Sequence, residues 1–200
     1  MIEPLQRGQT YHIYSRGNNK ENIFHERKNY DYFLSLYVKH IVPIALTYAY
    51  CLMRNHFHLL VRIKTTDELV KDLTGFENLS GLEVEKILKR KPSQSFANFF
   101  NAYTKAYNKQ YERTGALFER PFGRKPVHNE RYFYQLLIYI HQNPQKHGFV
   151  DDFRQWPYSS YSGMVSTKPS RLERDAVLQL FGGPDDYAEQ HLELIDLYED

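Results

Sequence analysis

Cysteine is almost absent from this chain of 200 residues, which contains only Cys51. A single cysteine cannot form an intramolecular disulfide or supply a zinc site built from several thiolates. Long hydrophobic runs are also lacking: the longest, residues 41–53, is interrupted by Pro43 and Thr47 and falls short of the roughly 20 residues that a spanning helix needs. The first residues do not resemble a signal peptide. We therefore expect a soluble cytoplasmic protein with one globular domain and a terminal appendage.

Net charge is also small, at +2, but the charges are unevenly distributed. Residues 89–131 contain ten Lys or Arg against three Glu, whereas residues 171–200 contain nine acidic residues against two arginines. Aromatic residues are frequent, including 17 Tyr, and many are interleaved with the basic residues. A basic middle of this kind is typical of proteins that bind a polyanion, although a solvated helix face gives a similar count.

Two histidines stand at alternate positions of an apolar stretch, residues 56–63. In an extended strand, alternate side chains point to opposite faces of the sheet. One face would present Phe57, Leu59 and Val61, and the other His56, His58 and Leu60. The Cα atoms of the two histidines would be about 6.6 Å apart, so both imidazoles could converge on one small cation. The alternative is a pair of solvated or hydrogen-bonded histidines, because short motifs recur by chance.

Hydrophobic periodicity and turn residues predict the order of the elements. Strands are predicted at residues 10–15, 44–53, 56–63, 115–118 and 122–127, and helices at residues 28–40, 66–73, 93–111, 130–143, 172–180 and 187–198. The strand at 122–127 should be peripheral, because proline prefers sheet edges. The aromatic residues of the helix at 93–111 should belong to the core. Residues 74–92, with a further helix predicted at 82–89, are interpreted as a variable insertion.

The helix at residues 130–143 combines an apolar and a polar stripe. Asn129 is a suitable N-cap, and the helix should end at Asn143 because Pro144 disfavours a helical conformation in the residue before it. The apolar stripe consists of Phe133, Leu136, Leu137 and Ile140, and the polar stripe of Tyr132, Gln135, Tyr139 and Asn143. A polar stripe on a well-packed helix needs a polar neighbour. The histidine pair with a cation is one candidate, and water is the other.

Four groups of motifs occur along the chain in a characteristic order. They are Tyr11-His12-Ile13 with Ser15-Arg16-Gly17-Asn18-Asn19; Met53-Arg54-Asn55-His56-Phe57-His58-Leu59-Leu60-Val61; Tyr107-Asn108 with Gly115-Ala116-Leu117-Phe118; and Tyr139-Ile140-His141-Gln142-Asn143-Pro144 with Trp156-Pro157-Tyr158-Ser159-Ser160-Tyr161. Together they resemble the single-tyrosine HUH transposases, particularly the branch of REP-associated tyrosine transposases. The resemblance covers most of residues 10–161.

This resemblance implies an α+β fold of the HUH endonuclease type, with a ferredoxin-like antiparallel sheet flanked by helices. Residues 1–161 would form the catalytic domain, with the insertion at 74–92, and residues 162–200 an acidic helical appendage. His56 and His58 would bind a divalent metal, Mg²⁺ or Mn²⁺, with Asn143 as third ligand; Gln142 is the alternative, since other branches use glutamine. Tyr139 would attack single-stranded DNA and form a 5′-phosphotyrosine.

The expected partner is single-stranded or hairpin DNA, with no membrane contact. Candidate DNA contacts are Arg16, Asn18, Lys20, Arg54, Lys105, Lys109, Arg120 and Arg124. Either His141 or Lys146 could assist deprotonation of the tyrosine, which could act within a monomer or across a homodimer. Two other functions fit the same residues: a non-catalytic regulator that binds structured DNA, and a metal-dependent hydrolase that uses water. Covalent trapping would distinguish the three.

Overall fold

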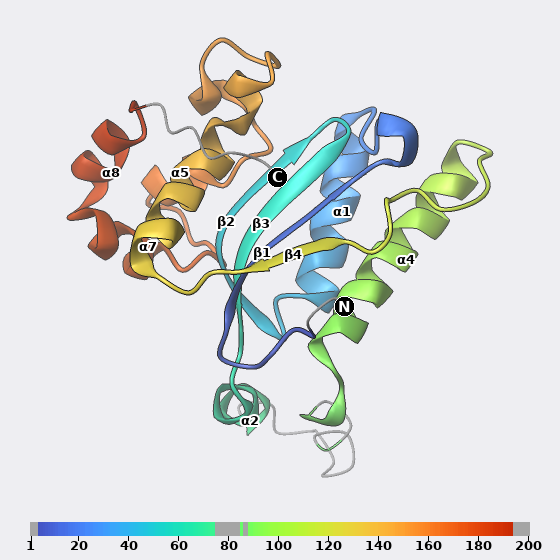
Figure 1. The fold of residues 1–200 in the computed structure, drawn as a ribbon, viewed down its shortest axis with the longest axis horizontal. Coiled ribbons are helices and arrows are strands. Elements are labelled where there is room, and N and C mark those ends of the chain that lie inside the picture. The colour runs from blue at the N-terminus through green and yellow to red at the C-terminus, as the bar shows by residue number, and fades with distance from the viewer. Residues whose placement is uncertain (1–3, 75–84, 86–87, 194–200) are drawn as a thin grey trace.

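A computed structural model of the protein describes residues 4–74, 85 and 88–193. Four strands form one antiparallel sheet in the order β2-β3-β1-β4 (Figure 1). They are β1 (Thr10–Arg16), β2 (Ala45–Met53), β3 (His56–Ile63) and β4 (Gly123–Pro126). Helices connect β1 to β2 and β3 to β4, so the order of elements and of strands is that of a ferredoxin-like fold. The predicted α+β fold class is confirmed.

The helices lie in layers on the two faces of this sheet (Figure 1). One face is covered by α1 (Arg27–His40) and α4 (Pro92–Gln110), which pack against each other. The other face is covered by α5 (Glu130–Lys146), which packs against β2 and β3. The remaining elements are η1 (Asn18–Lys20), α2 (Thr66–Thr74), η2 (Phe153–Gln155), α6 (Tyr161–Val165), α7 (Arg174–Phe181) and α8 (Pro184–Gln190). Among the described residues, no helix is both long and apolar enough to cross a membrane.

Strand β3 divides its side chains between the two layers, as its alternating sequence predicts. Phe57, Leu59 and Val61 belong to the hydrophobic core beneath α1 and α4. Leu60 belongs to a second core beneath α5, and His56 and His58 are buried near it. The predicted aromatic core of α4 is also confirmed: Phe96, Phe99, Phe100, Tyr103 and Tyr107 are buried in the first core. These aromatic rings are therefore packing residues.

The loop before β4 differs from the sequence-based prediction. Residues 115–118 do not form a strand, and only an isolated bridge joins Phe118 to Gly17. The Asn18 side chain bonds the carbonyl of Ala116 at 2.7 Å and Gly115 has a φ of +85°, so this segment follows a loop. The following strand, β4, lies at the edge of the sheet, as predicted.

The second difference concerns the end of α5. Asn129 caps the helix as predicted, because its side chain accepts a hydrogen bond from the Tyr132 amide at 2.8 Å. The helix does not end at Asn143, however, and continues to Lys146. Pro144 removes only one backbone donor there, and the last turn is closed by a bond from the His147 amide to the Asn143 carbonyl.

The C-terminal helices pack next to α5 (Figure 1). Val177, Phe181 and Tyr187 are buried in the same core as Leu137 of α5. The helix predicted at 172–180 corresponds to α7. The helix predicted at 187–198 corresponds in part to α8, which begins and ends earlier, and residues 194–200 lie outside the described residues. Most of the predicted insertion at 74–92, including much of its helix at 82–89, also lies outside them.

Candidate active site

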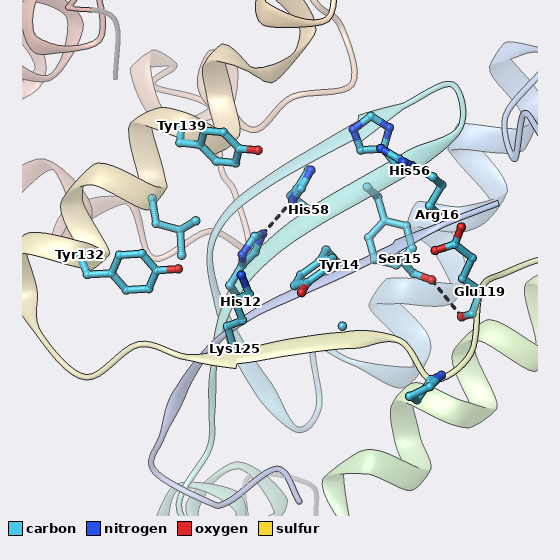
Figure 2. Close-up of a pocket in the computed structure, with 14 residues that line it drawn as sticks. His12, Tyr14, Ser15, Arg16, His56, His58, Glu119, Lys125, Tyr132 and Tyr139 are labelled. Atoms are coloured by element: carbon cyan, nitrogen blue, oxygen red, sulfur yellow. Dashed lines mark hydrogen bonds between the residues drawn. The ribbon is translucent and has the colours of Figure 1, made fainter. Parts of the chain in front are cut away.

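A cavity of about 410 Å³ opens between α5 and the sheet (Figure 2). Strands β1 and β3 form its floor, α5 forms one wall, and the loop before β4 with β4 itself forms the other. The lining residues are His12, Tyr14, Ser15, Arg16, His56, Phe57, His58, Glu119, Pro121, Gly123, Lys125, Tyr132, Leu136 and Tyr139. Figure 2 shows Tyr132 and Tyr139 projecting from α5 over the sheet that bears the histidines.

His58 is held by a second histidine, His12. The Nε2 atom of His12 lies 2.8 Å from Nδ1 of His58, which is hydrogen-bonding distance (Figure 2). Burial lowers the pKa of His12 to about 3 and lowers the pKa of His58 well below its ordinary value. Both rings are therefore neutral at pH 7, and one donates a proton to the other. The contact fixes the orientation of the His58 ring, with Nε2 as the nitrogen that His12 does not engage.

His56 is oriented by its neighbour Asn55. Its Nδ1 atom lies 2.6 Å from the amide oxygen Oδ1 of Asn55, which can only accept a hydrogen bond. Nδ1 of His56 is therefore the protonated nitrogen, and Nε2 has the lone pair. Burial, with smaller effects of His147 and Arg16, lowers the pKa of His56 to about 3. Nε2 is buried with no hydrogen-bond partner among the described residues, a costly state that a bound ligand would relieve.

Helix α5 and its C-cap residue, His147, present three residues, four apart, to this histidine pair. The Tyr139 ring stands edge-on to His58, with centroids 5.8 Å apart, and the His147 ring stands edge-on to His56, with centroids 4.9 Å apart. Asn143 lies midway between them on the same helix face, so it faces the gap between the two histidines. Its amide Nδ2 donates to the Tyr139 carbonyl at 3.0 Å. Its Oδ1 is buried and has no hydrogen-bond partner among the described residues.

The residues around this gap suit an N, N, O donor set. No group of three or more His, Cys, Asp or Glu side chains in the described part of the chain is arranged to hold a metal ion. A cation bound in this gap would have as its protein donors the imidazoles of His56 and His58 and the amide oxygen of Asn143. Two of these residues have a buried acceptor atom to which no group of the described residues donates a hydrogen bond, namely His56 Nε2 and Asn143 Oδ1. Such acceptors fit a cation better than they fit an empty core.

Comparisons with known proteins show what the chain is similar to. No protein-family model matches the chain. A Haemophilus influenzae protein, provisionally named a REP-associated tyrosine transposase, is 26% identical to the chain over 115 residues, and the chain spans 58% of the length of that relative. The solved structure of a REP-associated tyrosine transposase bound to a REP hairpin matches with a TM-score of 0.57 and 14% identity, over 84% of this chain and 87% of that chain. The resemblance to REP-associated tyrosine transposases is confirmed. At this identity, the solved structure demonstrates the shared fold.

Within this transposase-like fold, the two alternative residues beside Asn143 point away from the cavity. Gln142 donates its amide to the carbonyls of His191, at 2.9 Å, and Glu193. His141 contacts His191 Nε2 at 2.9 Å and Ser160 Oγ at 2.7 Å. Lys146, by contrast, lies on the cavity side, with Nζ 5.2 Å from the centroid of the Tyr139 ring. The geometry thus favours Asn143 over Gln142 as a ligand, and Lys146 over His141 as the residue next to the phenol.

The predicted DNA contacts are scattered over the molecule. Of these residues, Arg16 lines the cavity. Asn18 is engaged with the Ala116 carbonyl, while Arg124 stacks on Phe122 with its guanidinium carbon 4.1 Å from the ring centroid. Lys20, Arg54, Lys105, Lys109 and Arg120 are exposed. Because α4 covers the face opposite α5, Lys105 and Lys109 are not brought to the cavity.

The residues around the site that were assigned no role from the sequence include His12 and Lys125, which line the cavity, and His147, whose ring contacts His56. His12 and Lys125 are paired across β1 and β4, so both point to the cavity side of the sheet. The alternation of His12, Tyr14 and Arg16 along β1 was a signal that these side chains share one face. Contact of His12 with His58 depends on the β1–β3 register, which the local pattern does not contain.

Proposed function

We propose that the protein is a metal-dependent DNA strand transferase that nicks single-stranded or hairpin DNA and rejoins it through a 5′-phosphotyrosine at Tyr139. The observation that supports this most strongly is the position of the Tyr139 phenol, edge-on to His58 in a cavity that His56 also lines. His56 Nε2, and Oδ1 of Asn143 one turn along α5 from Tyr139, are buried acceptors with no partner among the described residues. Hairpin DNA is proposed as substrate because the matching solved transposase is bound to a REP hairpin.

His56, His58 and Asn143 would hold the metal. Two imidazole nitrogens and one amide oxygen leave coordination positions open, and this mixed set suits Mg²⁺ or Mn²⁺ in function. When bound, the ion supplies positive charge that offsets the negative charge developing on the non-bridging phosphate oxygens. His12 and Asn55 contribute by fixing the two imidazole rings, as hydrogen-bond partners of metal-ligating histidines generally do.

The chain's own nucleophile is the Tyr139 hydroxyl. Its oxygen forms a bond to phosphorus, and the bond between phosphorus and the 3′-oxygen of the preceding nucleotide breaks. The phenol loses its proton, and the departing 3′-oxygen gains one. The Lys146 ammonium group near the ring would favour the phenolate over the neutral phenol. Because the tyrosyl ester preserves the phosphodiester linkage, a 3′-hydroxyl can attack it in a second transfer without ATP.

Covalent trapping tests this proposal. The protein is incubated with Mn²⁺ and an end-labelled hairpin oligonucleotide that has a single-stranded flank, and the products are separated on a denaturing gel. We expect a protein–DNA adduct that does not form with Tyr139→Phe, since no hydroxyl remains to attack. Tyr134→Phe is the matched control: Tyr134 lies on the same helix but stacks on Phe181, away from the cavity, so its adduct should persist.

The same gel distinguishes the two rival functions. A hydrolase would give nicked DNA without an adduct, and Tyr139→Phe would leave the nicking unchanged. A non-catalytic regulator would give neither product, although it would still shift the hairpin on a native gel. An adduct that survives in Tyr139→Phe would contradict the assignment of the nucleophile. Chelation with EDTA should abolish the adduct if the proposed metal requirement is right.

A further inference from the structure

The cavity continues beyond the histidine pair into a region that the proposed chemistry does not use. This region lies over β1 and β4 and is lined by Tyr14, Arg16, Gly123 and Lys125 (Figure 2). Tyr14 occupies its centre, since it is paired with His58 on β3 and with Gly123 on β4. Its side chain is only half-buried, so it borders the open cavity.

Gly123 allows the Tyr14 ring to lie directly on the backbone of β4. A Cβ atom at position 123 would lie 2.3 Å from Tyr14 Cζ and 2.4 Å from Cε2, far closer than such contacts occur. Paired residues in an antiparallel sheet project to the same face, so the ring covers the position that a side chain of residue 123 would occupy. One side of the ring is thus supported by the strand, and the exposed part of the ring borders the cavity.

The Tyr14 ring also continues an aromatic surface that starts at the histidines. Its centroid lies 4.8 Å from that of His12, with an interplanar angle of 36°, and 6.1 Å from that of His58, at 26°. His12 and His58 lie 5.0 Å apart at 21°. The three rings therefore have similar orientations and form one wall that leads from the candidate metal site to β4.

Charge around this wall favours an anion. Arg16 follows Tyr14 by two positions on β1, and Lys125 follows Gly123 by two positions on β4, so the two cations flank the ring. Glu119 is the one acidic residue among those lining the cavity, and it is exposed to solvent. Aromatic rings with flanking cations bind unpaired nucleotides, whose bases stack while their phosphates pair with the charges. A volume of about 410 Å³ is within the range of small-ligand sites.

We propose that Tyr14 is the platform of a nucleotide subsite, on which the base of one unpaired nucleotide next to the attacked phosphate stacks, with Arg16 and Lys125 contacting the phosphates. This inference rests on the proposed function in one respect, that the cavity receives DNA. Stacking tolerates any base but requires an accessible base face, which a duplex covers on both sides. The subsite would therefore select an unpaired nucleotide at the cleavage point rather than a particular base.

Binding measurements with Tyr14 variants test the platform. Affinity for a hairpin with a single-stranded flank is measured by fluorescence anisotropy in the Tyr139→Phe background, which prevents covalent capture. Tyr14→Ala should weaken binding about ten-fold, within the range measured for loss of one stacked base, whereas Tyr14→Phe, which retains the ring, should bind within about two-fold of its parent.

Abasic oligonucleotides separate stacking from a structural role of Tyr14. A single abasic nucleotide is moved along the flank. We expect one position next to the cleavage site at which the parent loses about ten-fold in affinity and at which Tyr14→Ala loses nothing further. If Tyr14→Ala weakened binding equally for intact and all abasic oligonucleotides, or if Tyr14→Ala and Tyr14→Phe bound alike, the platform would be ruled out.

Gly123→Ala provides an independent test, because the new methyl group must displace the Tyr14 ring. It should weaken binding of the intact oligonucleotide about as much as Tyr14→Ala does, but should have no further effect in a Tyr14→Ala background, where the clash is gone. An equal loss in both backgrounds would contradict the proposal.

The outcomes also separate the two proposals. If oligonucleotide affinity follows the expected pattern but the wild type forms no adduct, only the strand transferase is refuted. If the adduct forms but Tyr14→Ala leaves the affinity unchanged, only the subsite is refuted.

Discussion

The two faces of the sheet differ in their buried hydrogen-bond acceptors. Beneath α1 and α4, two buried tyrosine hydroxyls have partners within the protein: Tyr103 donates to the Ile23 carbonyl at 2.6 Å, and Tyr37 bonds Thr47 at 2.7 Å. A buried atom on that face that has no partner among the described residues, Nε of Arg124, is a donor and not an acceptor. Beneath α5, His56 Nε2 and Asn143 Oδ1 are buried without a hydrogen-bond partner among the described residues. A single strand, β3, contributes to both faces through its alternating side chains.

This difference indicates that one face mainly stabilises the fold and that the other is suited to bind a ligand. A polar group that is buried and satisfied costs little, so the α1–α4 face can act as a packed foundation. Acceptors that are buried and unsatisfied destabilise the fold until a cation or donor reaches them. The α5 face is therefore less stable without a ligand than with one. Substitutions on the α5 face should mainly change metal binding and adduct formation, whereas substitutions on the α1–α4 face should mainly change the free energy of unfolding.

Removing both imidazoles should have the largest effect. We expect His56→Ala with His58→Ala to abolish Mn²⁺-dependent adduct formation and the increase in melting temperature that Mn²⁺ gives the wild type, a stabilisation of about 2.7 kcal/mol when the free ion is at 100 times its Kd. Differential scanning fluorimetry with Mn²⁺ or EDTA measures this. His25→Ala is the control, since His25 bonds the Tyr107 hydroxyl on the other face, at 2.7 Å. An undiminished Mn²⁺ response in the double variant would remove the basis for the metal site.

Truncating the residue between the histidines should instead reduce stability. Phe57 is fully buried, with its ring centroid 5.3 Å from that of Phe33 and 5.5 Å from that of Phe100. Phe57→Ala should lower the free energy of unfolding by about 3–5 kcal/mol, because it leaves a cavity among these rings. Urea titration in EDTA provides the measurement. The separation of the faces would be wrong if the double histidine variant, under the same conditions, lost as much stability as Phe57→Ala.

His12 should affect metal affinity more than stability. Because His12 orients the His58 ring, His12→Ala should raise the Kd for Mn²⁺ about 10–100-fold, as loss of such partners typically does. Isothermal titration calorimetry measures this directly, without DNA. His12→Gln, which keeps a hydrogen-bonding side chain, should recover part of the affinity. Equal Mn²⁺ affinity in His12→Ala and the wild type would show that the contact between the two rings is only structural.

A surface ion pair outside both faces should give the smallest effect. The Arg62 guanidinium donates hydrogen bonds to the Glu68 carboxylate, with Nη1 of Arg62 3.0 Å from Oε2 of Glu68. These bonds lower the pKa of Glu68 from its ordinary 4.5 to about 2. A depressed pKa in the folded state stabilises the protein above pH 4.5, and this contribution is lost as the pH falls towards 2. Since the pair is partly exposed to solvent, Glu68→Gln should cost less than about 1 kcal/mol at pH 7. Urea titrations across this pH range should show the two proteins converging in acid, and a constant difference would contradict this.

Much of the fold follows from local patterns, as particular elements show. Period-two alternation placed His56 and His58 together on one face of β3, and Asn129 marked the start of α5 correctly. The errors arose where a local preference competed with the surrounding structure. Pro144 was expected to end α5, but the last turn still closes through the His147 amide. Residues 115–118 were expected to be a strand, but the Asn18 side chain bonds the Ala116 carbonyl and holds them in a loop.

The sequence by itself determined which side chains share a face of a strand or helix, because those faces repeat within a few residues. Only the tertiary structure decided which faces meet. The contact of His12 with His58 joins residues 46 positions apart and depends on strand register. That Asn143 faces the histidines while Gln142 faces His191 depends on the rotation of α5, which packing on both of its sides sets. Register and helix rotation result from contacts between distant segments, and no local pattern contains them.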